Sequence, residues 1–156
     1  MNRASRPAES SGAAKHPARQ GILDTSTVIL LGRLDDRAGL PEEPLITAVT
    51  LAELTVGPLV ARGDQERAAR QAHLQVAEAS FEPLPFDAAA ARAFGKVATD
   101  LRRSGRKTAA RAFDAMIAAT AIANALPLYT CNAADFTGID DLELVLVAHP
   151  DSPDTA

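Results

Sequence analysis

The chain has 156 residues, of which 47% are hydrophobic and 23% charged, and these values suit one globular domain. Cys131 is its one cysteine and its three histidines are scattered, so we expect neither an internal disulfide nor a cysteine-based zinc site. Aromatic residues make up only 4%, which argues against a module that stacks nucleic-acid bases on aromatic rings. No apolar run reaches the length of a membrane span and no signal-peptide pattern is present, so we expect a cytoplasmic protein.

Charge is spread unevenly along the chain. Residues 1–20 hold four basic side chains and one acid, a net charge of +3, so the other 136 residues carry −7 within the total of −4. An acidic body does not attract a polyanion through its net charge, so action on nucleic acid would require local basic patches and metal ions. Residues 1–19 show no apolar period and are predicted to be a disordered tail, with a basic arm on nucleic acid as the alternative.

Apolar runs and helical patterns alternate through residues 20–150, which we predict to form one domain followed by a frayed end at 151–156. Strands are predicted at 21–24, 45–49, 81–86, 128–132 and within 142–150, the third being short or at an edge because it holds two prolines. Helices are predicted at 25–34, 50–61, 64–79, 87–105 and 112–125. This alternation favours a mainly parallel sheet that helices cover on both faces.

Particular residues mark the helix boundaries in this pattern. Asp87 is a candidate N-cap for the fourth helix, and Gly105 is a suitable residue to end it. The pair Gly57-Pro58 is expected to end or kink the second helix, since proline cannot donate a backbone hydrogen bond.

Four acids lie where a predicted strand ends or a predicted helix begins. Asp24 ends the first strand, and Glu53 lies in the first turn of the helix after the second strand. Asp114 lies early in a helix that is otherwise apolar, and Asp135 follows the strand 128–132. Ligands of parallel α/β folds bind outside the carboxyl ends of the strands, so these acids are mutually reachable. Like charges in a cluster must bind cations or protons, and oxygen ligands suit Mg²⁺ or Mn²⁺.

Each acid also has an ordinary structural interpretation. Asp24 is a suitable N-cap, Glu53 is a suitable exposed acid near a helix start, and Asp135 is a common turn residue. Asp114 is compatible with capping its own helix. For Asp114 capping is the weaker interpretation, because its helix stripe is apolar and is expected to face the core. For each of the other three acids the ordinary interpretation is at least as good as a functional one, whereas four acids at reachable positions favour a metal site.

The motifs around these acids resemble those of PIN-domain ribonucleases. "ILDTSTVI" looks like the opening motif of that family, with Asp24 as its first acid and Ser26 as its hydroxyl residue. "ITAVTLAEL" resembles the second motif and carries Glu53. "RAFDAMIAATAIANALPLYTCNAADF" resembles the third and fourth together, with Asp114 and Asp135.

The resemblance runs from about residue 21 to residue 149 and is greatest to the VapC toxins of type II toxin–antitoxin pairs. It implies a PIN-like three-layer α/β/α sandwich and a Mg²⁺- or Mn²⁺-dependent endoribonuclease that cuts structured RNA such as tRNA or rRNA. It also implies a homodimer and a small VapB-type antitoxin that blocks the site. The four acids are then the metal-binding and catalytic residues, with Asp135 a direct ligand or a residue just behind the ligands. Cys131 departs from the pattern, because relatives often have a basic residue there.

Neutral and basic residues complete the predicted site. Ser26, Thr130 and Asn132 are predicted to orient carboxylates or water by hydrogen bonds, or else to be a helix cap, a strand-end hydroxyl and a turn residue. Basic residues that precede the third acid are predicted to contact RNA phosphates, although such runs are usually solvated: Arg102, Arg103, Arg106, Lys107 and Arg111.

Two other functions start from the same residues. An aspartate-based phosphatase would need a second acid two residues after Asp24, where Ser26 stands, and a lysine far downstream, whereas the last lysine is Lys107. A non-catalytic PIN-like interaction module would need no metal, so Mn²⁺ binding would distinguish it from the nuclease.

Overall fold

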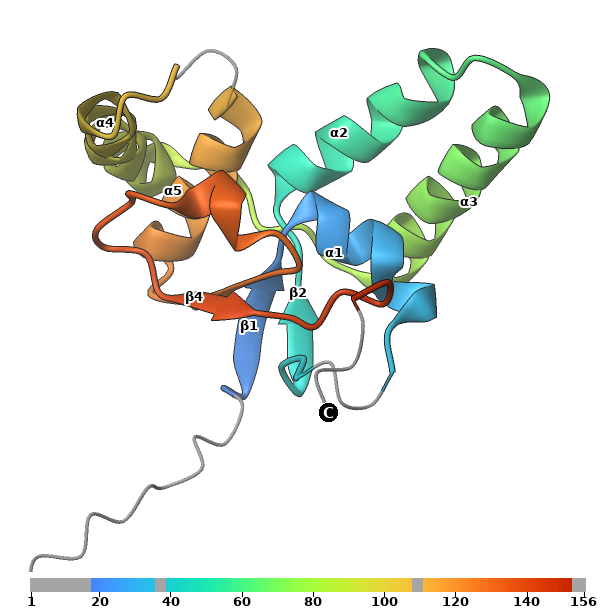
Figure 1. The fold of residues 1–156 in the computed structure, drawn as a ribbon, viewed down its shortest axis with the longest axis horizontal. Coiled ribbons are helices and arrows are strands. Elements are labelled where there is room, and N and C mark those ends of the chain that lie inside the picture. The colour runs from blue at the N-terminus through green and yellow to red at the C-terminus, as the bar shows by residue number, and fades with distance from the viewer. Residues whose placement is uncertain (1–17, 36–38, 108–110, 153–156) are drawn as a thin grey trace, which may run out of the picture.

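The computed structural model of the protein describes residues 18–35, 39–107 and 111–152 (Figure 1). The predicted tail lies outside the described residues except for positions 18 and 19, and so do residues 153–156 of the predicted frayed end. Within the described ranges, no helix has both the length and the apolar character needed to cross a membrane.

Four short parallel strands form the central sheet. They are β1 (Gln20–Leu23), β2 (Glu43–Leu45), β3 (Leu128–Thr130) and β4 (Leu144–Leu146), in the spatial order β2-β1-β3-β4. The chain moves from β1 to β2 on one side and returns to β3 on the other side of β1, so the connections diverge between β1 and β3. In parallel α/β sheets, ligands bind at the carboxyl ends of the strands beside such a point.

Helices cover both faces of this sheet in the described part of the chain. They are α1 (Thr25–Leu30), α2 (Ala48–Leu59), α3 (Asp64–Ser80), α4 (Ala88–Arg103) and α5 (Ala112–Ala123), with 3-10 turns η1 (Leu31–Arg33) and η3 (Ala133–Phe136). The helices α4 and α5 pack together on one side, and α2 and α3 form a hairpin that projects on the other (Figure 1). The prediction of a three-layer sandwich with a parallel sheet is confirmed.

An apolar core lies on each face of the sheet. Ile22 and Leu128 pack with residues of α4 and α5, including Ile117. Their neighbours along the strands, Leu23 and Tyr129, pack with apolar residues of α1, α2 and α3. This alternation is expected for strands buried on both faces, because successive side chains point to opposite sides.

Gly21 allows β1 to lie close to β3. A Cβ atom at this position would lie 2.3 Å from a carbon of the Tyr129 ring, so any larger residue would displace that ring. The resulting register pairs Leu23 with Tyr129. The next residue of each strand, Asp24 and Thr130, therefore lie side by side at the carboxyl end of the sheet.

The structure corrects the predicted second strand and the helix after it. The strand ends at Leu45, and α2 begins at Ala48 instead of residue 50. The reason is local, because the hydroxyl of Thr47 accepts the N–H of Thr50 at 3.1 Å and caps the helix. Consequently Glu53 lies in the second turn of α2, and the prediction of the first turn was wrong.

Two further boundaries differ from the prediction. Residues 81–86 form no strand, and only Leu84 makes an isolated bridge, to Thr47, since Pro83 and Pro85 have no N–H to donate. The helix α2 continues through Pro58 to Leu59, so the pair Gly57-Pro58 does not end it there.

Candidate active site

Asp24 is buried at the end of β1, and only 3% of it is exposed. Its carboxylate accepts the backbone N–H of Thr27 at 2.9 Å and thereby caps α1. It also accepts the hydroxyls of Ser26 at 3.0 Å and Thr130 at 2.6 Å. The capping interpretation is therefore correct, and the carboxylate also receives hydrogen bonds from two side chains that the sequence predicted to orient carboxylates or water.

Glu53 lies in α2 and is half-buried. Its Oε1 accepts the hydroxyl of Thr25 at 2.7 Å. Burial raises the pKa of Glu53, the hydrogen bond from Thr25 opposes that shift, and the negative charge of Asp24 adds to it. Sequence reasoning missed Thr25 as a site residue, although the run of three hydroxyl residues after the first acid was the available signal.

Asp114 lies in the first turn of α5 with 28% of its side chain exposed. Its pKa is raised from 3.8 to about 6, first by burial and then by the negative charges of Asp135, Glu53 and Asp24. The positive charge of Arg111 opposes this rise. The pKa of Asp114 therefore depends on the charges of the other three predicted acids.

Asp135 lies in the turn η3 and is held from two directions. The side chain of Asn132 donates to its Oδ2 at 3.0 Å, and Arg111 forms an ion pair with its Oδ1. The backbone N–H of Asn132 donates to the Thr130 hydroxyl at 2.9 Å, and that hydroxyl donates to Asp24. A chain of hydrogen bonds thus joins the first and last predicted acids.

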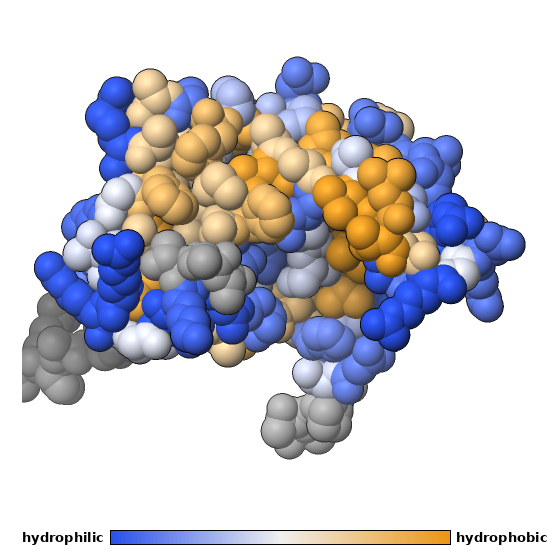
Figure 2. Space-filling view, turned by 90° about the horizontal axis from the view of Figure 1, so that it is seen from above, coloured by the Kyte–Doolittle hydropathy of each residue, from blue (hydrophilic) through white to orange (hydrophobic). Residues whose placement is uncertain are grey.

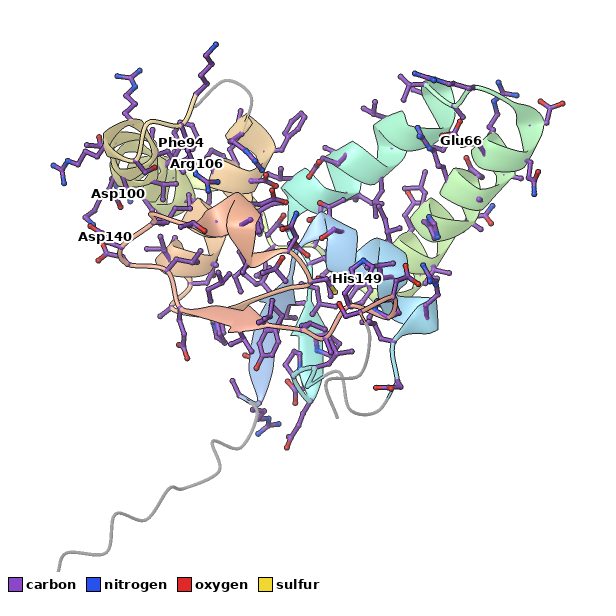
Figure 3. All side chains as sticks on the ribbon, viewed as in Figure 1. Glu66, Phe94, Asp100, Arg106, Asp140 and His149 are labelled. Carbon is purple, nitrogen blue, oxygen red and sulfur yellow. The ribbon has the colours of Figure 1, made fainter. Side chains whose placement is uncertain are left out.

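The five predicted RNA-contacting residues occupy different places. Arg102 and Arg103 are exposed in the last turn of α4, and Lys107 is exposed after it. Arg106 reaches the turn η3, where its guanidinium donates to the carbonyl of Ala134 at 2.5 Å (Figure 3). Arg111 pairs with two of the acids, so the structure brings Arg106 and Arg111 to the site and leaves the other three on the surface.

Two hollows flank the acids. One, of about 260 Å³, is lined by Thr25, Glu53 and residues of α1, α2 and α3. The other, of about 410 Å³, is lined by Ser26, Asn132 and His149 among others. Figure 2 looks onto this end of the molecule and shows hydrophilic residues between two apolar areas, one of them over α2.

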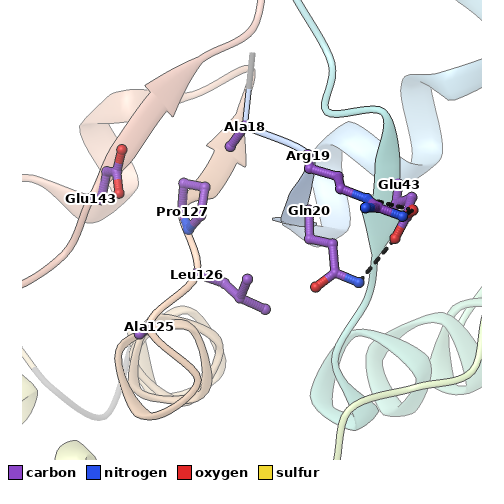
Figure 4. A pocket seen from close by; sticks show the side chains of 8 residues that line it. All are labelled: Ala18, Arg19, Gln20, Glu43, Ala125, Leu126, Pro127 and Glu143. Atoms are coloured by element: carbon purple, nitrogen blue, oxygen red, sulfur yellow. Dashed lines mark hydrogen bonds and ion pairs between the residues drawn. The ribbon is translucent and has the colours of Figure 1, made fainter. Parts of the chain in front are cut away.

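A third hollow, of about 550 Å³, lies at the opposite end of the sheet (Figure 4). It is lined by Gln20 and Glu43, which begin β1 and β2, and by Pro127, which precedes β3. The side chains of Gln20 and Glu43 are hydrogen-bonded to each other at 3.0 Å. Because ligands of parallel sheets bind at the carboxyl ends, we place the functional site at the acids.

The donor set at the acids suits a hard divalent cation. Four carboxylates from separate elements interact electrostatically there, and oxygen ligands of this kind are preferred by Mg²⁺ and Mn²⁺. As they stand, no three metal-binding side chains in residues 18–35, 39–107 and 111–152 form a ready group around one point. The guanidinium of Arg111 lies 3.6 Å from Oδ2 of Asp114 and is in contact with Asp135.

Comparison with known proteins assigns the chain and its fold to a family. The PIN domain model matches residues 22–142, so the chain belongs to the PIN domain family. The relative Ribonuclease VapC5 of Mycobacterium tuberculosis is 43% identical over 122 residues, which cover 77% of this chain and 87% of that protein. Ribonuclease VapC4 of the same organism is 32% identical over 131 residues, 83% of this chain and 98% of that protein.

Solved structures agree with this assignment. A crystal structure of VapBC-5 of Mycobacterium tuberculosis, a member of the VapBC family of toxin-antitoxin systems, has 39% identity and a TM-score of 0.69, and covers 83% of this chain and 99% of that one. VapBC2 of Rickettsia felis bound to a promoter DNA fragment has 24% identity and a TM-score of 0.63 over 81% of this chain and 98% of that one, which supports the fold. The resemblance to the PIN domain and to VapC proteins is therefore confirmed.

Proposed function

We propose that the protein is a Mg²⁺-dependent endoribonuclease toxin that hydrolyses phosphodiester bonds in structured RNA such as tRNA or rRNA, with Mn²⁺ able to replace Mg²⁺. One observation carries the proposal: four carboxylates interact electrostatically at the carboxyl end of the sheet, where the connections diverge. Membership of the PIN domain family and the similarity to proteins named VapC ribonucleases support it.

In this proposal Asp24, Glu53 and Asp114 hold the cation, and Asp135 is a ligand or lies just behind the ligands. A bound divalent cation supplies an acidified water and offsets negative charge on the phosphate in the transition state. The protein's own part is orientation, because fixed ligands avoid a reorganisation cost during the reaction.

Neutral side chains provide that orientation. Ser26 and Thr130 donate to Oδ2 of Asp24, and the backbone N–H of Thr27 donates to Oδ1, so both carboxylate oxygens have a fixed direction. Asn132 donates to Asp135 and fixes it in the same way. Their predicted role as orienting residues is consistent with these contacts and is kept as a proposal.

Basic residues beside the acids are proposed to hold RNA. Arg102, Arg103 and Lys107 are exposed and available to phosphates, while Arg106 stands at the rim near Asp135. These local charges would offset the repulsion between an acidic protein and a polyanion. Arg111 belongs to the same predicted group, and its position among the acids is considered below.

Partners and location are further parts of the proposal. A cognate VapB-type antitoxin is expected because the similar solved structures are toxin-antitoxin complexes. Exposed apolar side chains on and just after α2, Val56, Leu59 and Val60, offer a surface for a protein partner, either an antitoxin or a second copy in a homodimer. A cytoplasmic location is expected for such an RNA-cleaving protein.

The test is cleavage of total tRNA and rRNA by purified, antitoxin-free protein, with Mg²⁺, with Mn²⁺ and with EDTA. Asp24→Asn is the companion variant, because asparagine still caps α1 and the protein should remain folded. We expect discrete fragments that need both the metal and Asp24. Loss of about 100-fold or more is expected for the variant, since a neutral amide is a poor ligand for a hard cation.

Three results would contradict the proposal. Cleavage that persists in EDTA would remove the metal from the mechanism. A folded protein that binds no Mn²⁺ and cleaves none of these RNAs would favour the non-catalytic interaction module. Phosphate trapped covalently on Asp24 would favour the phosphatase.

A further inference from the structure

Arg111 is the one predicted RNA contact whose guanidinium lies among the acids instead of on the surface. It is the N-cap residue of α5 and makes no side-chain hydrogen bond to the start of that helix. Its guanidinium forms an ion pair with Asp135 and lies 3.6 Å from Oδ2 of Asp114. The side chain is 36% exposed, so it can leave the site without crossing a packed core.

Two of the four acids, Asp114 and Asp135, are engaged by the guanidinium of Arg111. The side chain of Asp114 is 28% exposed and that of Asp135 is 24% exposed. Both side chains face the guanidinium of Arg111. In the described residues no three metal-binding side chains form a ready group. A bound dication would have to draw Asp114 and Asp135 toward the other two acids, and each of the two is now engaged with Arg111.

Electrostatics indicates whether the guanidinium of Arg111 or a divalent cation binds the acids more strongly. A guanidinium and a metal ion compete for the same carboxylates, and their mutual repulsion in a partly buried site opposes simultaneous binding. A divalent cation with several oxygen ligands attracts the acids more strongly than one half-exposed guanidinium, since exposed ion pairs contribute little. Removal of the guanidinium should therefore make the site easier for a cation to enter.

We propose that Arg111 is an internal counter-ion that occupies the acidic site of the metal-free protein and is displaced when a divalent cation binds. This inference rests on the proposed function, since it concerns the same acids. Displacement would leave the guanidinium at the rim of the site, where it can pair with an RNA phosphate. One residue would thus neutralise the acids before the cation binds and contact the substrate afterwards.

The experiment is calorimetric titration of Mn²⁺ into the full-length protein without RNA. Arg111→Ala and Arg111→Gln both remove the guanidinium, and agreement between them excludes a folding defect peculiar to either. Arg106→Ala is the matched control, because Arg106 also lies at this rim but donates to the carbonyl of Ala134 instead of an acid. All three variants lose one positive charge.

We expect both Arg111 variants to bind Mn²⁺ about fivefold more tightly than the wild type, on the scale of a half-exposed ion pair. Arg106→Ala should change the dissociation constant by less than about twofold, because only long-range charge is lost. A dissociation constant that rises in the Arg111 variants would overturn the proposal and make Arg111 a positioning residue for Asp135. Equal changes in the Arg111 and Arg106 variants would also overturn it.

A second measurement follows Arg111 directly. The Nε–Hε signal of Arg111, assigned by its loss in Arg111→Gln, should shift when diamagnetic Mg²⁺ is added, while that of Arg106 stays in place. An Arg111 signal that does not move at saturating Mg²⁺ overturns the exchange.

Asp24→Asn separates this inference from the proposed function. Mn²⁺ binding by the wild type that is lost in Asp24→Asn supports the metal site whatever the Arg111 variants do. Absence of Mn²⁺ binding in every protein overturns both.

Discussion

The two sides of the acidic site hold their carboxylates in different ways. On the side of β1 and α1, Asp24 is 3% exposed and receives hydrogen bonds from neutral donors, among them the hydroxyls of Ser26 and Thr130. On the side of α5 and η3, Asp114 and Asp135 are more exposed and pair with a cation, Arg111. Neutral donors orient a carboxylate and leave its charge in place, whereas a cation cancels the charge and can be exchanged.

After the loss expected for Asp24→Asn, the largest expected effect is that of pH on the side of α5 and η3. The pKa of Asp114 is raised from 3.8 to about 6 by burial and by the other acids. The carboxyl must lose its proton to bind a metal, so we expect cleavage to fall about tenfold per pH unit below 6. A pH–rate profile under single-turnover conditions with Mn²⁺ well below saturation measures this, because saturating metal would displace the proton, and a flat profile between pH 5 and 7 would contradict it.

The same group gives a stability prediction of known sign. A raised pKa means that the folded protein holds the proton more firmly than the unfolded chain, so the contribution to stability is present below about pH 4 and is lost as the pH rises through about 6. Asp114→Asn should therefore raise the melting temperature of the EDTA-treated protein at pH 7.5 and change it little at pH 4. An equal change at both pH values would show that Asp114 is not under this strain.

A smaller effect is expected on the side of the neutral donors. Thr130→Val keeps the shape of the side chain but removes the donor to Asp24 and the acceptor of the Asn132 N–H. We expect cleavage to fall about tenfold, as for loss of a group that orients a metal ligand. Thr120→Val is the matched control, because Thr120 is also fully buried but donates to the carbonyl of Met116 within α5. Similar losses in both variants would mean that the effect is general destabilisation.

Exposed basic residues away from the acids should have a smaller effect, on RNA binding. Arg102 and Arg103 are exposed at the end of α4, and their joint replacement by Ala should weaken RNA binding a few-fold and reduce the slope of log K against log salt by about 2. The control is Arg62→Ala with Arg67→Ala, two exposed arginines around the start of α3. Filter binding at several salt concentrations with Asp24→Asn protein measures the slope, and an unchanged slope removes this patch from the RNA surface.

The smallest effect concerns a second capping aspartate. Asp87 accepts the N–H of Ala90 at 2.9 Å, the same local contact that Asp24 makes with Thr27, but it is exposed and lies outside the site. Asp87→Ala should cost about 1 kcal/mol in the free energy of unfolding and leave cleavage unchanged. Urea denaturation and the cleavage assay measure both quantities, and lost cleavage in a folded variant would refute the distinction between the two caps.

Much of the fold could be predicted because its signals are local. Helical periodicity, the cap at Asp87 and the glycine at 105, which has a φ of +76°, each act over a few residues and place α3, α4 and α5 within two residues of the structure. The predictions that were wrong concern segments whose structure depends on pairing with other parts of the chain. Residues 81–86 look apolar enough for a strand, but pairing needs backbone donors that two prolines remove.

The sequence by itself determined which residues could form the site: four acids at the ends of predicted elements, with hydroxyl and amide residues beside them. Only the tertiary structure decided how they are connected. The contact of Thr130 with Asp24 spans 106 positions and exists because β1 and β3 pair in one register. The ion pair of Arg111 with Asp135 spans 24 positions, and it places an arginine that the sequence suggested for RNA among the acids instead. Local propensity acts over a helical turn or a strand, whereas charge pairing follows distance in space.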